Sequence, residues 1–255
     1  MAKRIRPIGH EDRLSLVEHL DELRTRIVIA LAAFGVALAV CFWQNHALLK
    51  IVNHPLGHRK PVTLGVAEPF ITTLTVASYA AILVAMPIIL YELYGFVLPA
   101  FSPTERRVAM PLLLMVPFLF IAGVAFAYFV VIPAALQFLL HFNQHQFNLQ
   151  VRARDYYGFV SAALIAVTLV FEVPLFILGL IRLRVLSAEK LRRSRRVGYV
   201  IMFALAVALP GVDPVTTTIE GVALLILFEA TIWIALALDR RWRAEATRPA
   251  TIPEP

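Results

Sequence analysis

Two glutamates, Glu22 and Glu105, are the residues whose type and position best suit recognition of a ligand. Glu22 lies in HLDELRTR (19–26) and Glu105 in FSPTERR (101–107), both in polar segments beside apolar runs. A guanidinium binds a carboxylate through two parallel hydrogen bonds, a geometry that lysine cannot copy. Two such acids at one groove favour a ligand with two arginines. Taken singly, each acid also fits ordinary surface charge, with Glu22 paired to Arg26.

Signatures of catalysis are missing from the sequence. It contains no H-E-x-x-H, no G-x-S-x-G and no glycine-rich phosphate loop. Its single cysteine, Cys41, excludes an internal disulfide and any multi-cysteine metal site. His141 and His145 have metal-ligand spacing but no nearby carboxylate, so we interpret them as polar residues of an interfacial loop. We therefore expect neither an enzyme nor a metal or cofactor site.

The composition indicates a membrane protein. The chain has 255 residues, of which 60% are hydrophobic and only 16% charged, and its mean hydropathy is +0.76. The net charge of +7 does not predict nucleic-acid binding, because the basic residues lie in short loops between apolar runs. The basic N-terminus lacks an A-x-A-like cleavage site, so we expect a retained first span rather than a cleaved signal peptide.

The apolar runs predict an all-α, polytopic protein with one six-span membrane domain over residues 1–240 and a disordered tail over 241–255. A helix crosses the ~30 Å hydrocarbon core with about 20 residues. The third run is long enough to project beyond the lipid as a kinked helix, and the fifth is short enough that a re-entrant hairpin is the alternative. The predicted spans are 27–43, 76–101, 108–140, 156–181, 197–210 and 215–238.

The basic residues also predict an orientation. Most Lys and Arg residues fall in the N-terminal segment, the second and fourth loops and the tail, and the fourth loop (182–196) alone carries seven. By the positive-inside rule these segments, with both termini and the two glutamates, lie in the cytoplasm. The fourth loop is expected to hold anionic lipid headgroups.

Four further acids, Glu92, Glu172, Glu220 and Glu229, lie inside apolar runs. Such residues are costly in a bilayer and usually have a reason. Glu92 and Glu220 lie near span ends, where they could snorkel to an interface. Glu172 lies deeper, and three interpretations stay open: a protonated acid bonded within the bundle, a proton relay, or a polar contact for a partner helix.

A set of motifs resembles the TatC family, the multi-spanning receptor subunits of the twin-arginine protein translocase. The resemblance runs from about 14 to 238 and is specific as an ordered set. Its motifs are HLDELRTR (19–26), EPF (68–70), PIILYELYGFVLPAFSPTERR (87–107), FAYFVVIP (126–133), FEVP (171–174) and a Pro-x-x-Asp-Pro turn (210–214).

The resemblance implies a concave, glove-like bundle of six helices in the plasma (inner) membrane. It implies that the cytoplasmic face binds the twin-arginine signal peptides of folded cargo and nucleates the translocation site. Its implied partners are TatA- and TatB-like single-span subunits, with several copies of the chain in the complex and use of the proton-motive force.

The resemblance also implies roles for individual residues. Glu22 and Glu105 would contact the two arginines, with Arg24 and Arg106 in support and Phe96 close by. In addition, Glu172 would face the concave side, and Pro55 and Asp213 would lie in functional outward loops. Two adjacent prolines often precede the aspartate in the family, whereas Gly211-Val212 intervenes here.

Three rival functions make different predictions. A proton-coupled small-solute transporter using Glu172 predicts internal repeats, which the sequence does not show. An intramembrane hydrolase predicts a nucleophile–base pair within the spans, and no histidine lies in any of them. A structural scaffold predicts that replacing Glu22 and Glu105 leaves signal-peptide binding unchanged.

Overall fold

The computed structural model describes residues 16–97, 103–146, 149–182, 185–211 and 213–246. Within these ranges it describes all side chains except those of 16–19, 97, 103–114, 182 and 239–246. The helices are α1 (Leu16–Trp43), α2 (Asn45–Asn53), the 3-10 turn η1 (His54–Leu56), α3 (Glu68–Val97), α4 (Pro103–Phe126), the π-helical η3 (Ala127–Val131), α5 (Ile132–His141), α6 (Ala153–Phe171), α7 (Val173–Arg182), α8 (Ala188–Arg193), α9 (Arg195–Ala208) and α10 (Pro214–Ala246).

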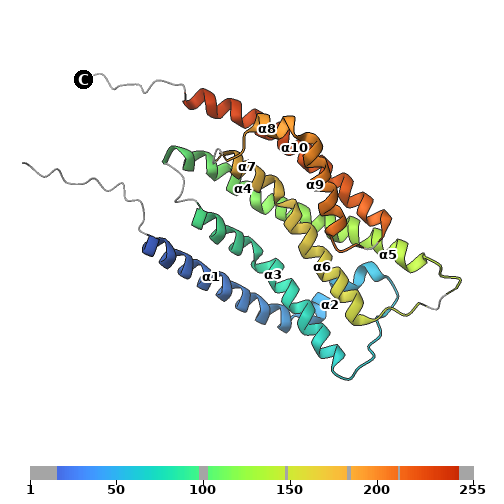
Figure 1. The fold of residues 1–255 in the computed structure, drawn as a ribbon. Coiled ribbons are helices and arrows are strands. Elements are labelled where there is room, and N and C mark those ends of the chain that lie inside the picture. Colours follow the sequence, from blue (N-terminus) through green and yellow to red (C-terminus); the bar gives the residue numbers. More distant parts are fainter. Residues whose placement is uncertain (1–15, 98–102, 147–148, 183–184, 212, 247–255) are drawn as a thin grey trace, which may run out of the picture.

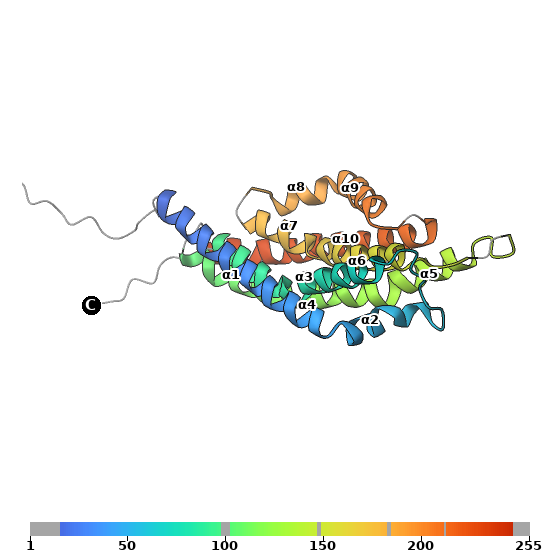
Figure 2. The same cartoon turned by 90° about the horizontal axis from the view of Figure 1, so that it is seen from below.

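The long helices run side by side and alternate in direction, so that the start of α1 and the end of α10 lie toward one end of the bundle (Figure 1). The opposite end carries α2, the end of α5 and the turn from α9 to α10 (Figures 1 and 2). Five helical segments of the described chain are long and apolar enough to cross a membrane; they are Leu20–Trp43, Glu68–Phe96, Met115–His141, Ala153–Ile181 and Pro214–Leu238.

The short fifth run coincides with α9, a helix of 14 residues, which is shorter than a bilayer-crossing helix. The structure therefore supports a helical protein with five candidate spans. Six spans and the placement of both termini in the cytoplasm remain predictions. The long third run forms one helical path through α4, η3 and α5, and its π-helical turn directly precedes the segment that contains Pro133.

The fourth apolar run is broken at Glu172, between α6 and α7. Pro174 follows two residues later and has no backbone N–H, and its ring would clash with the carbonyl four residues before it in a continuous helix. The backbone N–H of Glu172 instead donates to the Leu169 carbonyl at 3.1 Å. The break places a glutamate side chain in the middle of a predicted span.

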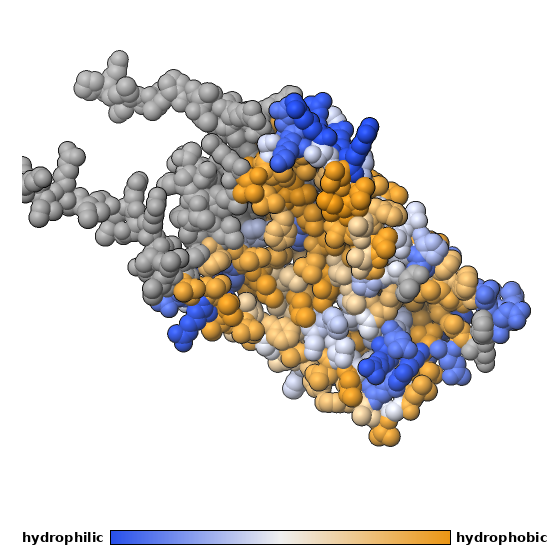
Figure 3. Space-filling view, viewed as in Figure 1, coloured by the Kyte–Doolittle hydropathy of each residue, from blue (hydrophilic) through white to orange (hydrophobic). Residues whose placement is uncertain are grey.

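Close helix contact at the centre depends on a small residue. A Cβ added to Gly123 on α4 would lie 2.9 Å from the Thr168 Cα on α6. Small residues let helix backbones approach closely in membranes, where burial of apolar surface does not drive association. The visible outer surface is mainly hydrophobic, with hydrophilic residues gathered around α8 and toward the bundle ends (Figure 3). That distribution fits a lipid-exposed bundle.

Two local predictions need correction. The outward loop expected to hold Pro55 is not wholly irregular, because it contains α2, a nine-residue helix. The tail expected to be disordered from residue 241 is helical through Ala246, at the end of α10. The sequence RWRAEA (241–246) is rich in good helix formers, which extend α10 past its apolar part. The rest of the tail lies outside the described residues.

Candidate functional site

Glu22 lies in a three-residue ion cluster that joins α1 to α3. The Arg26 Nη2 and Nε atoms donate to Glu22 Oε1 at 2.6 and 3.1 Å. The third nitrogen, Nη1, donates to Glu92 Oε2 on α3 at 2.9 Å. The side chains of Arg26, Glu22 and Glu92 are 23%, 25% and 13% exposed. One guanidinium therefore bridges two partly buried carboxylates.

A glycine makes room for this cluster. A Cβ at Gly95 would clash with Arg26 Nη1. Gly95 lies on α3 three residues after Glu92, where neighbouring helical turns present one face. The absence of a side chain at Gly95 leaves space for the Arg26 guanidinium beside Glu92.

The other predicted binding residues lie in segments near the same end of the bundle. Arg24 is exposed on α1, and Phe96 is half-buried in the last turn of α3. Glu105 and Arg106 belong to the first turn of α4, which lies at this end of the bundle (Figure 1). Their side chains lie outside the described part of the chain. Joint contact of Glu22 and Glu105 with one ligand therefore stays a prediction.

Glu172 is buried in the bundle rather than solvated. The residue is 1% exposed, and neither carboxyl oxygen has a hydrogen-bond partner among the described residues. The Tyr94 hydroxyl on α3 is also buried without a partner and lies within electrostatic range of Glu172. Most buried polar groups are hydrogen-bonded, so two neighbouring exceptions call for an explanation.

The two predicted outward-loop residues lie at the opposite end of the bundle. Pro55 lies in the first turn of η1, directly after α2. Asp213 precedes α10 and caps it, because its Oδ1 accepts a hydrogen bond from the Thr216 N–H at 2.8 Å. Asp213 is 2% exposed. These contacts give Asp213 a structural role in starting α10.

Glu220 lies one turn beyond Thr216. The sequence suggested that it could snorkel to an interface, but the structure buries it. It is 1% exposed, and within the described part of the chain neither of its carboxyl oxygens has a hydrogen-bond partner. The Asp213 Oδ2 and Thr216 Oγ1 atoms nearby are unpaired as well. Glu220 is buried because α10 turns this face toward the bundle, which hydropathy alone does not reveal.

Sequence reasoning missed a second ion pair, between Glu68 and Arg152. Glu68 Oε1 accepts from Arg152 Nε at 2.9 Å, while Oε2 accepts from the Leu64 and Gly65 N–H groups at 2.9 and 3.2 Å. Two backbone bonds between Val62 and the start of α6, each 2.8 Å long, lie beside it. The EPF motif draws attention to Glu68, but the sequence does not indicate its partner, because Arg152 lies 84 positions away.

The basic fourth loop is only partly free to face lipid. Arg195 pairs with Glu229 on α10 at 3.3 Å and lies 5.9 Å from the Trp233 ring centre. Tyr199 donates a hydrogen bond to the same Glu229 carboxylate. Glu229 therefore has partners on α9, which explains this acid within an apolar run.

Comparison with known proteins gives consistent matches. The model of the family "Sec-independent protein translocase protein (TatC)" matches residues 18–222. The Carboxydothermus hydrogenoformans TatC is 34% identical over 88% of this chain and 94% of its own length. For the Synechocystis TatC, the identity is 35% over 84% and 85%.

Solved structures of the twin-arginine translocase receptor TatC also match. One has a TM-score of 0.73 at 30% identity and covers 86% of this chain and 99% of that protein. Another, solved in the detergent DDM, has a TM-score of 0.75 at 31% identity with the same coverage. These relatives are protein translocase components, and none supports the solute-transporter alternative.

Proposed function

Because the chain belongs to the TatC family of Sec-independent protein translocase proteins, we propose that it binds twin-arginine signal peptides of folded proteins. The observation that carries this proposal is the match to a twin-arginine translocase receptor over 86% of the chain. The proposed site is the end of the bundle with Glu22 on α1, the last turn of α3 and the first turn of α4. In this role the chain nucleates a translocation site and catalyses no reaction.

The ion cluster on α1 and α3 supports an arginine ligand. Arg26 shows that this part of the bundle accommodates a guanidinium between two carboxylates, with three N–H donors used. A signal-peptide arginine offers the same planar donors, whereas a lysine offers one point charge. We propose that Glu22 and Glu105 receive the two arginines. Arg24 and Arg106 would orient the acids, and Phe96 would line the approach.

The remaining roles follow from the family. We propose that the protein lies in the plasma (inner) membrane with both termini in the cytoplasm. It would assemble with TatA- and TatB-like single-span subunits and with further copies of itself. The fourth loop would hold anionic headgroups through its exposed arginines, among them Arg192 and Arg193. The carboxyl of Glu172 would meet a polar side chain of a partner helix entering the bundle.

The test is binding of a labelled signal peptide to the purified full chain in nanodiscs. An Arg-Arg peptide is compared with its Lys-Lys version for the wild type, Glu22→Gln and Glu105→Gln. We expect the wild type to prefer Arg-Arg by about tenfold or more, as hydrogen bonds to charged groups contribute roughly 1.5–3 kcal/mol each. Each variant should lose most of that preference.

The matched control is Glu189→Gln, which removes a glutamate 63% exposed and paired to Arg193 in α8. It should leave both affinities unchanged. If the wild type binds the two peptides alike, or if Glu189→Gln weakens binding as much as Glu105→Gln, the two-glutamate site is wrong.

A further inference from the structure

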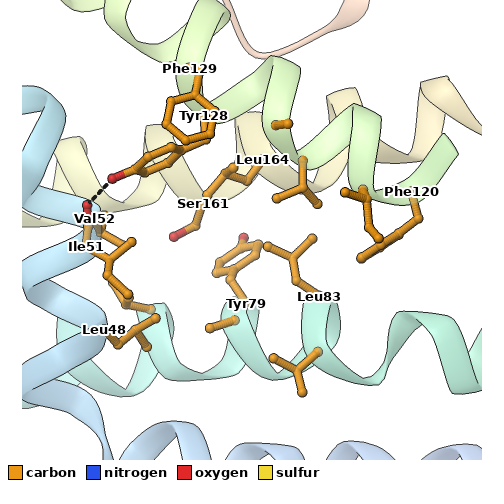
Figure 4. A pocket seen from close by; sticks show the side chains of 16 residues that line it. Leu48, Ile51, Val52, Tyr79, Leu83, Phe120, Tyr128, Phe129, Ser161 and Leu164 are labelled. Carbon is orange, nitrogen blue, oxygen red and sulfur yellow. Dashed lines mark hydrogen bonds between the residues drawn. The ribbon is translucent and has the colours of Figure 1, made fainter. Parts of the chain in front are cut away.

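An apolar groove of about 460 Å³ lies between α3 and α4. Its floor is formed by α6, through Ser161 and Leu164, and α2 closes one end through Leu48 and Ile51 (Figure 4). Nearly all of its lining is aliphatic or aromatic. Because α2 closes its end, the groove belongs to the half of the bundle that carries α2, whereas the starts of α1 and α4 lie toward the other end (Figure 1).

The rim of the groove faces the surroundings of the bundle. Val84 on α3 is 62% exposed, and Ile121 and Phe129 on the opposite wall are 64% and 72% exposed. Both walls belong to candidate membrane spans. In a bilayer, the groove therefore opens sideways toward hydrocarbon, where an apolar cavity of this size does not hold water.

The end wall of the groove is held in place by hydrogen bonds. The Tyr128 hydroxyl donates to the Ile51 carbonyl of α2 at 2.8 Å (Figure 4). Behind it, the Tyr156 hydroxyl donates to the Val52 carbonyl at 2.6 Å. These bonds tie α2 to the spanning helices. The groove is thus a formed site with a fixed end rather than a gap between helices.

The segment next to this end wall carries only positive charge. Between residues 45 and 67 there is no Asp or Glu, and Lys50 is exposed on α2 next to the groove-lining Ile51. All six basic or histidine side chains of the segment are exposed; they are His46, Lys50, His54, His58, Arg59 and Lys60. An apolar groove that ends beside an exposed positive patch is complementary to an anionic phospholipid.

We propose that the groove between α3 and α4 binds an acyl chain of an anionic phospholipid whose phosphate group lies against Lys50 of α2. Lipid tails are as apolar as the leucines of a helix, so the groove itself would accept either an acyl chain or an apolar partner helix. The positive patch favours the lipid, because a phosphate headgroup gains from it and an apolar partner helix does not. The site is separate from the twin-arginine site and does not depend on it.

The experiment uses the full chain in phosphatidylcholine nanodiscs that contain a phosphatidylglycerol with a diazirine in its acyl chain. After irradiation, adducts are mapped by mass spectrometry. We expect adducts on 76–84 and 120–129 to exceed those on Val36 and Val40 of α1, which are 66% and 57% exposed. Those α1 residues report ordinary contact with lipid.

Two variants fill the groove from opposite walls: Ala125→Phe on α4 and Ala80→Phe on α3. Each should lower the groove adducts to the level of the α1 reference. Either suffices should the other aggregate. The matched control is Ala39→Phe, which adds the same ring at an exposed position of α1 and should leave the groove adducts unchanged.

The headgroup is tested separately, with a phosphatidylcholine photolipid of the same acyl chains. We expect the phosphatidylglycerol probe to be preferred in the groove, and Lys50→Gln to lower that preference about fivefold. The proposal is overturned if groove and α1 label alike, if neither filling variant matters, or if the two headgroups label alike. It is also overturned if adding a single-span partner subunit abolishes groove labelling, because a helix would then be the occupant.

Discussion

The ion pair between Arg26 and Glu92 should be worth more than a surface ion pair, and the structure sets the comparison. Its atoms are 2.9 Å apart, and its side chains are 23% and 13% exposed. Exposed pairs couple by ~0.2–1 kcal/mol in double-mutant cycles, while residues of one ion-pair network couple by up to ~3 kcal/mol. A partly buried pair lies between these limits, so we predict a coupling of about 1–2 kcal/mol.

The measurement is a double-mutant cycle with Arg26→Gln, Glu92→Gln and the double variant. The free energy of unfolding in mixed micelles is followed by tryptophan fluorescence. The cycle isolates the pair, because the loss of the Glu22 contact in Arg26→Gln is present in both arginine variants. The comparison pair is Arg193–Glu189, whose side chains are 79% and 63% exposed at the same 2.9 Å.

The outcome is decided by the difference between the two cycles. A coupling for Arg26–Glu92 clearly above that for Arg193–Glu189 supports a cluster that fastens α1 to α3. Equal couplings would refute the reasoning, because they would show that partial burial adds nothing to this pair. The Arg26 guanidinium would then be a surface group that a competing arginine displaces at little cost.

Three further substitutions test the packing and the two ends of the bundle. Gly123→Ala should destabilise the fold by about 1–3 kcal/mol because its Cβ would lie 2.9 Å from the backbone of α6, whereas Gly179→Ala, with nothing within 4 Å, should be neutral in the same unfolding assay. Asp213→Ala should cost about 1 kcal/mol through loss of the α10 cap and Asp213→Asn much less; equal losses would contradict the capping role. Glu68→Gln should make the segment 57–67 more sensitive to limited proteolysis, since it weakens the bond to α6, and unchanged cleavage would show that the backbone bonds suffice.

Hydropathy predicted the spanning helices more reliably than it predicted the side-chain contacts between them. Long apolar runs identify spanning helices directly, because lipid demands that every backbone group be bonded within the segment. The same criterion missed α2, which is short and only half apolar. Glu92 was expected to snorkel, since nothing in its own sequence window shows that Arg26 reaches it from 66 positions away. Pairings of this kind depend on how helices pack, which periodicity does not encode.

At the candidate site, too, the sequence predicted the segments but not the contacts between them. The resemblance placed Glu22, Phe96 and Glu105 in three segments, and the structure brings these segments to one end of the bundle. It also adds Gly95, whose importance is steric and therefore invisible without the arginine beside it. A motif identifies the residues that carry the charge. Whether a neighbouring position such as Gly95 tolerates a side chain depends on the space between the helices, which the motif does not show.

Six glutamates of the described chain form two groups that differ in how their charge is met. Glu22, Glu68, Glu92 and Glu229 each lie within 3.3 Å of an arginine. By contrast, the carboxylates of Glu172 and Glu220 are buried without any partner in the described chain. An unsatisfied polar group inside a membrane costs several kcal/mol, so an incoming hydrogen-bond partner gains that amount in addition to its own contacts. In the proposed role, in which partner helices bind and leave, such groups would favour assembly without adding a permanent bond to the resting fold.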